Sequence, residues 1–89
     1  MRAVVTVVGK DKTGIISRVS TFLAEKGVNI LDISQTILED YFAMIMIVDV
    51  SKATLKLADL AEESRAMGEK IGMSVRVQHE DIFNVMHGV

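Results

Sequence analysis

The chain of 89 residues contains no cysteine, no proline and no tryptophan. The absence of cysteine excludes a disulfide framework, a thiolate metal site and a cysteine nucleophile. Without proline there is no polyproline segment and no obligate cis turn. Aromatic residues are limited to three phenylalanines and one tyrosine, and the formal net charge is only −2. The chain therefore lacks both the basic surface and the interleaved aromatics that nucleic-acid binding requires.

Long apolar runs are missing as well. The longest uncharged apolar run, residues 41–48, is far shorter than the ~20 residues of a membrane-spanning helix. The N-terminus enters a strand-like pattern directly and shows no signal peptide, so we expect a cytoplasmic protein without a membrane partner. A hydrophobic fraction of 49% and a charged fraction of 25% are typical of a globular chain, and the length suffices for one domain.

The spacing of apolar residues predicts six elements in the order strand, helix, strand, strand, helix, strand. Their expected ranges are residues 2–8, 15–26, 28–38, 41–50, 53–71 and 73–78. Gly27 is expected to end the first helix, Ser51 to cap the second, and Gly68 and Gly72 to mark its fraying end. This order is typical of a ferredoxin-like α+β fold, with two helices on one face of a four-stranded antiparallel sheet. Residues 1–80 would form this domain, and residues 81–89 a short C-terminal tail with a helical pattern.

The third predicted strand is apolar on both faces. One face carries Phe42, Met44, Met46 and Val48, and the other carries Ala43, Ile45 and Ile47. Because two helices cover only one face of such a sheet, the other face needs a partner. We predict that Phe42, Met44 and Met46 contribute to the interface of a homodimer or higher oligomer. The alternative is that the C-terminal tail partly covers the outer face.

Patterns for catalysis and metal binding are weak. The serines have no neighbouring histidine, and the cluster of His79, Glu80, Asp81 and His87 matches no zinc motif. The loop from Gly9 to Gly14 lacks the lysine and hydroxyl residue of a phosphate loop, because Ile15 and Ile16 follow it. We expect a non-enzymatic protein without cofactor or metal. A weaker alternative is a small enzyme that uses His79, Asp81 and His87.

The loop before the first predicted helix still suggests a ligand. Free amides and the positive end of a helix suit a carboxylate or a phosphate. A plain strand-to-helix turn, in which Asp11 or Thr13 caps the helix, is the alternative interpretation.

Residues 5–30 resemble the ACT domain, a small regulatory module of amino-acid metabolism. The resemblance rests on strand residues 4–8, on the loop Asp11–Ile16 and on residues 27–30, and residues 33–50 continue it. It extends over residues 1–80. More narrowly, the chain is similar to stand-alone small ACT-domain proteins of the uncharacterised type, and through them to the ACT modules of glycine-cleavage regulators.

The resemblance implies an oligomer that binds a small effector, usually an amino acid, at a homodimer interface and thereby regulates another protein. The ligand-binding residues that it implies are Asp11, Lys12, Thr13, Gly14, Ile15, Asn29 and Ile30. Gly9 stands where some members have a ligand-holding histidine, which leaves a ligand carboxylate to backbone amides and an ammonium group to Asp11. The alternative is a protein-interaction and dimerisation module whose ligand site has lapsed.

Overall fold

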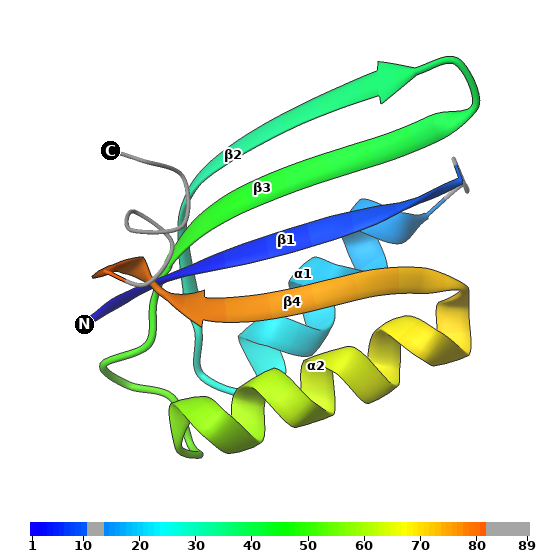
Figure 1. The fold of residues 1–89 in the computed structure, drawn as a ribbon. Coiled ribbons are helices and arrows are strands. Elements are labelled where there is room, and N and C mark those ends of the chain that lie inside the picture. Colours follow the sequence, from blue (N-terminus) through cyan, green and yellow to red (C-terminus); the bar gives the residue numbers. More distant parts are fainter. Residues whose placement is uncertain (11–13, 82–89) are drawn as a thin grey trace.

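Six elements in the predicted order form one sheet with two helices against it (Figure 1). The computed structural model describes residues 1–10 and 14–81. Its elements are β1 (Arg2–Lys10), α1 (Ile15–Glu25), β2 (Asn29–Leu38), β3 (Tyr41–Asp49), α2 (Leu57–Ile71) and β4 (Met73–His79). The predictions for Asp11, Lys12 and Thr13, and for the tail beyond residue 81, lie outside the described residues.

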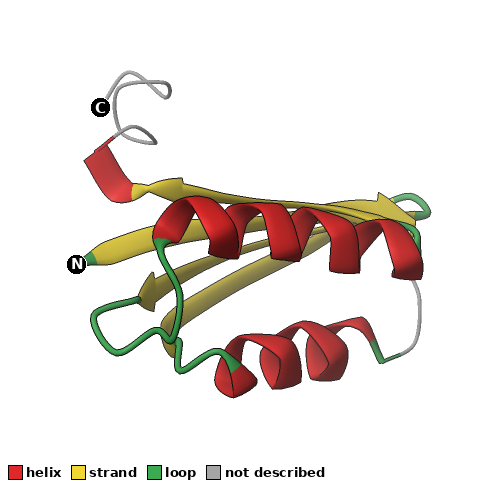
Figure 2. Cartoon of the chain, turned by 90° about the horizontal axis from the view of Figure 1, so that it is seen from below, coloured by secondary structure: helices red, strands yellow, loops and turns green. Residues whose placement is uncertain are grey.

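The four strands form one antiparallel sheet in the order β2-β3-β1-β4, with β2 and β4 at its edges. Both helices lie on the same face of this sheet, as Figure 2 shows. The ferredoxin-like α+β fold predicted from the sequence is therefore confirmed. Neither helix within the described ranges is long and apolar enough to cross a membrane.

The core lies between the helices and one face of the sheet. Strands β1, β3 and β4 contribute alternate residues to it, β2 contributes only the partly buried Ile30, and each helix contributes a stripe at three- or four-residue spacing. Phe42, Met44 and Met46 belong to this core, with exposed fractions of 5%, 0% and 0%. Their predicted role in a subunit interface is therefore wrong for their side chains. A two-residue period separates the faces of a strand without saying which face the helices cover, and here the open face carries Ala43 and Ile45 instead.

The second helix begins later than predicted. Lys56 precedes its first residue, and Ser51 lies in a turn before it. Longer-range contacts hold this turn, since the Thr54 N–H donates to the carbonyl oxygen of Lys26 at 2.9 Å. Ser51 does not cap α2, because Lys56 occupies the position before the helix; the Ser51 N–H donates to Asp49 Oδ1.

Gly68 does not mark a fraying end of α2 but lies in the helix, fully covered by the sheet. A Cβ atom at this position would lie 2.6 Å from Val75 Cγ2 and 2.7 Å from the Met73 carbonyl oxygen. Such distances are far below van der Waals contact, so only glycine lets α2 approach β4 this closely. The tight packing of α2 on β4 thus depends on one residue.

Candidate functional site

The start of α1 follows Gly14. Gly14 precedes the helix with φ 85°, a left-handed conformation that favours glycine, and its carbonyl oxygen accepts a hydrogen bond from the Arg18 N–H at 3.0 Å. No side chain of the described residues caps the helix, and its first turn contains no acidic residue. A Cβ atom at Gly14 would meet nothing within 4 Å. Within the described part of the chain, no side chain therefore engages the amides of the first turn, which together with the positive helix end suit an anion.

Two of the predicted ligand-binding residues offer little side-chain surface. Ile15 is 4% exposed and packs into the core, and Ile30 is half-buried against the same core. Their side chains hold the start of α1 and the start of β2 in place. Any contact of these two residues with a polar ligand has to come from their backbone groups.

Asn29, the first residue of β2, is exposed and borders a small hollow. This hollow has a volume of about 230 Å³ and is lined by Gly27, Asn29, Asp49, Ser51 and Lys52. The hydrogen bond from the Ser51 N–H to Asp49 Oδ1, 2.9 Å long, holds the pKa of Asp49 below its ordinary value. Asp49 therefore stays ionised beside Asn29. The sequence analysis missed Asp49 and Lys52, although the pairing of β2 with β3 places Asp49 directly opposite Asn29.

Within one chain, Gly14 and Asn29 lie at opposite ends of the sheet. Asn29 pairs with Asp49, and Asp49 pairs with Arg2, so Asn29 lies where β1 begins. Gly14 follows the other end of β1, beyond Lys10 (Figure 1). A strand of nine residues separates these two ends by about 27 Å. One copy of the chain therefore does not bring the two predicted parts of the site together.

The edge strand β2 is almost entirely uncovered. Nine of its ten residues are exposed, Asp32 is its one charged residue, and no strand of the described chain pairs with its outer side. Four large apolar side chains project from it, namely Leu31, Ile33, Ile37 and Leu38, of which the last is 75% exposed. A long apolar edge without lysine or proline is a template for pairing with another strand. Sequence patterning did not single out this edge, because β2 shows the same apolar residues that a buried strand would have.

Gly9 lies inside β1 rather than beyond its end, and its missing side chain is filled by a neighbour. A Cβ atom at Gly9 would lie 2.2 Å from Met73 Sδ and 3.3 Å from the Gly72 carbonyl oxygen. Met73 thus occupies the space that any larger residue at position 9 would need. This packing accounts for glycine at the position where the sequence resemblance implies a histidine in some members.

Polar and charged residues at the end of β4 interact with one another and with Arg2 of β1. The Asp81 N–H donates to His79 Nδ1 at 3.0 Å, and Glu80 forms an ion pair with Arg2. Within residues 1–10 and 14–81, no group of three or more potential ligands is placed to hold a metal ion. His87 lies outside the described residues, so the alternative role of the histidines stays untested.

Comparison with known proteins supplies the family. Residues 2–78 match the ACT domain family. A UPF0237 protein of Methanocaldococcus jannaschii is 53% identical over 88 residues, which cover 99% of this chain and 98% of that protein. A UPF0237 protein of Clostridium perfringens is 53% identical over 89 residues, which cover 100% of both chains.

Solved structures agree with this assignment. An ACT domain protein from Streptococcus pneumoniae superposes with a TM-score of 0.83 at 43% identity, over 93% of each chain. A candidate glycine cleavage system transcriptional repressor superposes with a TM-score of 0.70 over 86% of this chain and 44% of its own. Its identity of 21% relates the two proteins by fold alone.

Proposed function

Because the chain belongs to the ACT domain family, we propose that it is a non-enzymatic regulatory module that binds a small effector, an amino acid, between two copies of itself. The two copies associate along their β2 edges, and the effector lies between the start of α1 in one copy and Asn29 of the other. Binding shifts the equilibrium of a regulated protein partner.

The separation of Gly14 from Asn29 carries this proposal. When two β2 strands pair in antiparallel fashion about a two-fold axis, the beginning of each strand lies beside the end of the other. Leu38, the last residue of β2, lies at the same end of the sheet as Lys10 and the start of α1. Pairing of β2 with β2 therefore moves Asn29 of one copy toward the Gly14 end of the other.

The chemistry of the two ends is complementary to an amino acid. The start of α1, which no described side chain caps, offers backbone donors and a positive field to the carboxylate. Asp11 in the preceding loop, or Asp49 in the hollow beside Asn29, offers a negative charge to the ammonium group. Lys12, Thr13 and Ile15 contribute through the loop backbone, while Asn29 supplies both a donor and an acceptor.

A thermal-unfolding panel tests the binding. The protein is unfolded and refolded to remove carried-over ligand, and its midpoint is measured with each proteinogenic amino acid. A ligand at a hundred times its dissociation constant adds about 2.7 kcal/mol, which raises the midpoint by roughly ten degrees for so small a domain. We expect one amino acid, or a few related ones, to produce this shift and Asn29→Ala to abolish it. A flat panel would contradict the effector and favour a dimerisation module with a lapsed site.

A pair of matched variants tests the assembly. Ile33 on β2 and Ile45 on β3 are both isoleucines with exposed fractions of 41%, but only Ile33 lies on the edge strand. Lysine at position 33 introduces charge into the proposed interface, whereas lysine at position 45 lies on the open face of the sheet. We expect light scattering to show monomers for Ile33→Lys and dimers for Ile45→Lys. The reverse result would place the interface on the open face.

A further inference from the structure

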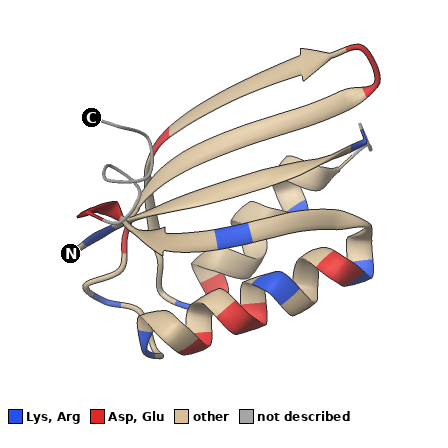
Figure 3. Cartoon of the chain, viewed as in Figure 1, with Lys and Arg blue, Asp and Glu red and all other residues tan. Residues whose placement is uncertain are grey.

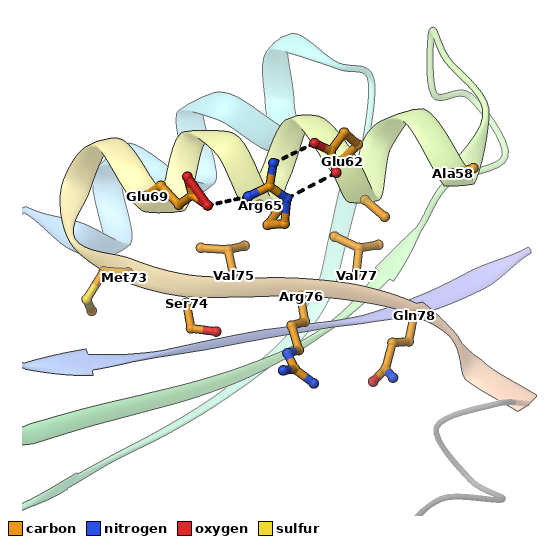
Figure 4. A pocket seen from close by; sticks show the side chains of 11 residues that line it. Ala58, Glu62, Arg65, Glu69, Met73, Ser74, Val75, Arg76, Val77 and Gln78 are labelled. Atoms are coloured by element: carbon orange, nitrogen blue, oxygen red, sulfur yellow. Dashed lines mark hydrogen bonds and ion pairs between the residues drawn. The ribbon is translucent and has the colours of Figure 1, made fainter.

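The opposite edge of the sheet has a groove that the proposed effector site does not use. No described strand pairs with the outer side of β4, and this edge runs beside α2. The space between them forms an open cavity with a volume of about 670 Å³. It is lined by one side of α2, from Ala58 to Glu69, and by β4 from Met73 to Gln78 (Figure 4).

The base of this groove, between β4 and α2, is apolar. Val75 and Val77 point from β4 toward the helix, as Figure 4 shows, and small Ala58 and Ala61 leave room above them. Charged side chains stand at the rim. Arg65 donates to both carboxylate oxygens of Glu62, from Nε at 3.0 Å and from Nη2 at 2.5 Å.

Arg65 also pairs with Glu69, one turn further along α2. The three rim side chains therefore neutralise one another in part and are linked to one another along the helix. An apolar side chain that enters the groove meets valine and alanine without having to break an ion pair between α2 and β4.

The other side of β4 carries an unpaired cation. Ser74, Arg76 and Gln78 point away from α2 in Figure 4, and Arg76 is exposed. Its guanidinium group forms no hydrogen bond or ion pair with any residue of the described chain. Figure 3 shows it as the one basic position within β4. A strand that pairs with β4 would place every second side chain beside this cation and the others over the groove.

We propose that the free edge of β4 binds an extended peptide segment of a partner protein in which apolar and acidic side chains alternate. The peptide backbone pairs with the outward-facing amides and carbonyls of β4. Its apolar side chains enter the groove beside α2, and its acidic side chains face Arg76. This mode of recognition obtains affinity from the main chain and specificity from alternate side chains.

A second copy of this chain fits the same edge poorly. Two β4 strands that pair in antiparallel fashion over their full length, Met73–His79, have Arg76 at the centre of the pairing. Arg76 would then lie opposite its own equivalent, and like charges directly opposite one another destabilise a strand pair. The charge of this edge therefore favours an acidic partner over self-association.

Synthetic peptides test the proposal on the full chain. The probes are two labelled peptides of eight residues, one with alternating valine and glutamate and one with alternating valine and lysine. We expect fluorescence anisotropy at low salt to show tighter binding of the glutamate peptide. The Arg76→Glu variant should weaken this binding by about fivefold or more and bind the lysine peptide better than wild type does. Arg18→Glu, which changes an exposed arginine on α1, serves as the matched control and should leave both affinities unchanged.

Two further measurements locate the peptide. The exposed position Ala58 accepts glutamine without a change in the core, and Ala58→Gln should weaken both peptides by filling the groove. Hydrogen exchange should show new protection in β4 and none in β2 when the glutamate peptide binds. Equal binding of the two peptides, insensitivity to Arg76→Glu, or protection of β2 alone would overturn the proposal. Protection of β4 that depends on protein concentration in the absence of peptide would assign the edge to a second copy and overturn it as well.

Discussion

At the scale of single residues, Ser64 is the buried polar side chain of the described core. It is 0% exposed on the sheet-facing side of α2, and its hydroxyl group has no hydrogen-bond partner among residues 1–10 and 14–81. The buried residues of α2 lie four residues apart and are Leu60, Ser64 and Gly68. Their side chains become smaller along the helix toward Gly68, which contacts β4. The small serine side chain suits the space between α2 and the sheet, whereas its buried hydroxyl group without a partner destabilises the folded state.

We therefore predict that Ser64→Ala raises the free energy of unfolding by about 1 kcal/mol, because the variant buries no unsatisfied hydroxyl and alanine favours the helix. Urea unfolding monitored by circular dichroism measures the change. Ser20→Ala, at a partly exposed position within α1, reports the contribution of helix propensity alone and should give a smaller increase. A loss of stability in Ser64→Ala would mean that the hydroxyl group has a partner.

At the scale of elements, α2 and β4 lie in close contact. Gly68 is the residue that permits it, since a Cβ atom there would lie 2.7 Å from the backbone oxygen of Met73. This oxygen belongs to the backbone of β4, which has less room to move aside than the end of a flexible side chain. An added methyl group must therefore shift the helix away from the strand.

We predict that Gly68→Ala lowers the free energy of unfolding by about 1–3 kcal/mol, even though alanine has the higher helix propensity. The double variant Gly68→Ala, Val75→Ala should recover part of this loss, because Val75 Cγ2 is the other atom in the way. Thermal and urea unfolding of the two single variants and the double variant give the coupling. Additive losses in the double variant would contradict the assigned contact.

The connection from β3 to α2 has an acid-dependent element. Asp49 accepts a hydrogen bond from the Ser51 N–H and lies near the N-terminal ammonium group, and both interactions lower its pKa in the folded protein. A carboxyl group with a lowered folded-state pKa stabilises the fold above its unfolded-state pKa, and this contribution is lost as the pH falls through the folded-state pKa.

We expect the wild-type protein to lose stability more steeply than Asp49→Asn as the pH falls below the ordinary aspartate pKa of about 3.9. Above that pH the wild-type protein should be the more stable of the two. Midpoints of thermal unfolding measured from neutral pH to strongly acidic pH give the comparison. Parallel pH profiles for the two proteins would show that the hydrogen bond to Ser51 does not stabilise the fold.

Sequence patterning succeeded where a signal is local and failed where a contact is distant. The order of the elements and the left-handed Gly27 at the end of α1 follow from periodicity and from glycine chemistry. The start of α2 does not, because a hydrogen bond from the Thr54 N–H to the distant Lys26 carbonyl oxygen helps to fix the turn before it. The same holds for the buried side of β3, since a period of two cannot tell the helix-covered face from the open one.

At the scale of the whole molecule, the sheet has two edges of different character. The β2 edge is long, apolar and nearly uncharged, whereas β4 carries Arg76 and runs beside the groove of α2. We assign the first edge to a second copy of the chain and the second edge to an acidic peptide. The two assignments can be tested independently, because Ile33 and Arg76 lie on opposite edge strands of the sheet.

The candidate effector site could be predicted from the sequence only in its parts. Gly14 and Asn29 stand out as residues, but their separation by the length of β1 appears only in the folded chain. Because of that separation, the two residues can contribute to one site only if they come from two different subunits.

Mixing of subunits tests this claim most directly. The variants Asp11→Ala and Asn29→Ala are unfolded together, refolded as a mixture and titrated calorimetrically with the amino acid that shifts the thermal midpoint of the wild-type protein. If each site takes Asp11 from one copy and Asn29 from the other, a mixed dimer has one site with both residues intact. The account predicts no binding by either variant alone and about a quarter of the wild-type number of sites in an equal mixture. A mixture that binds no more than the separate variants would contradict the shared site.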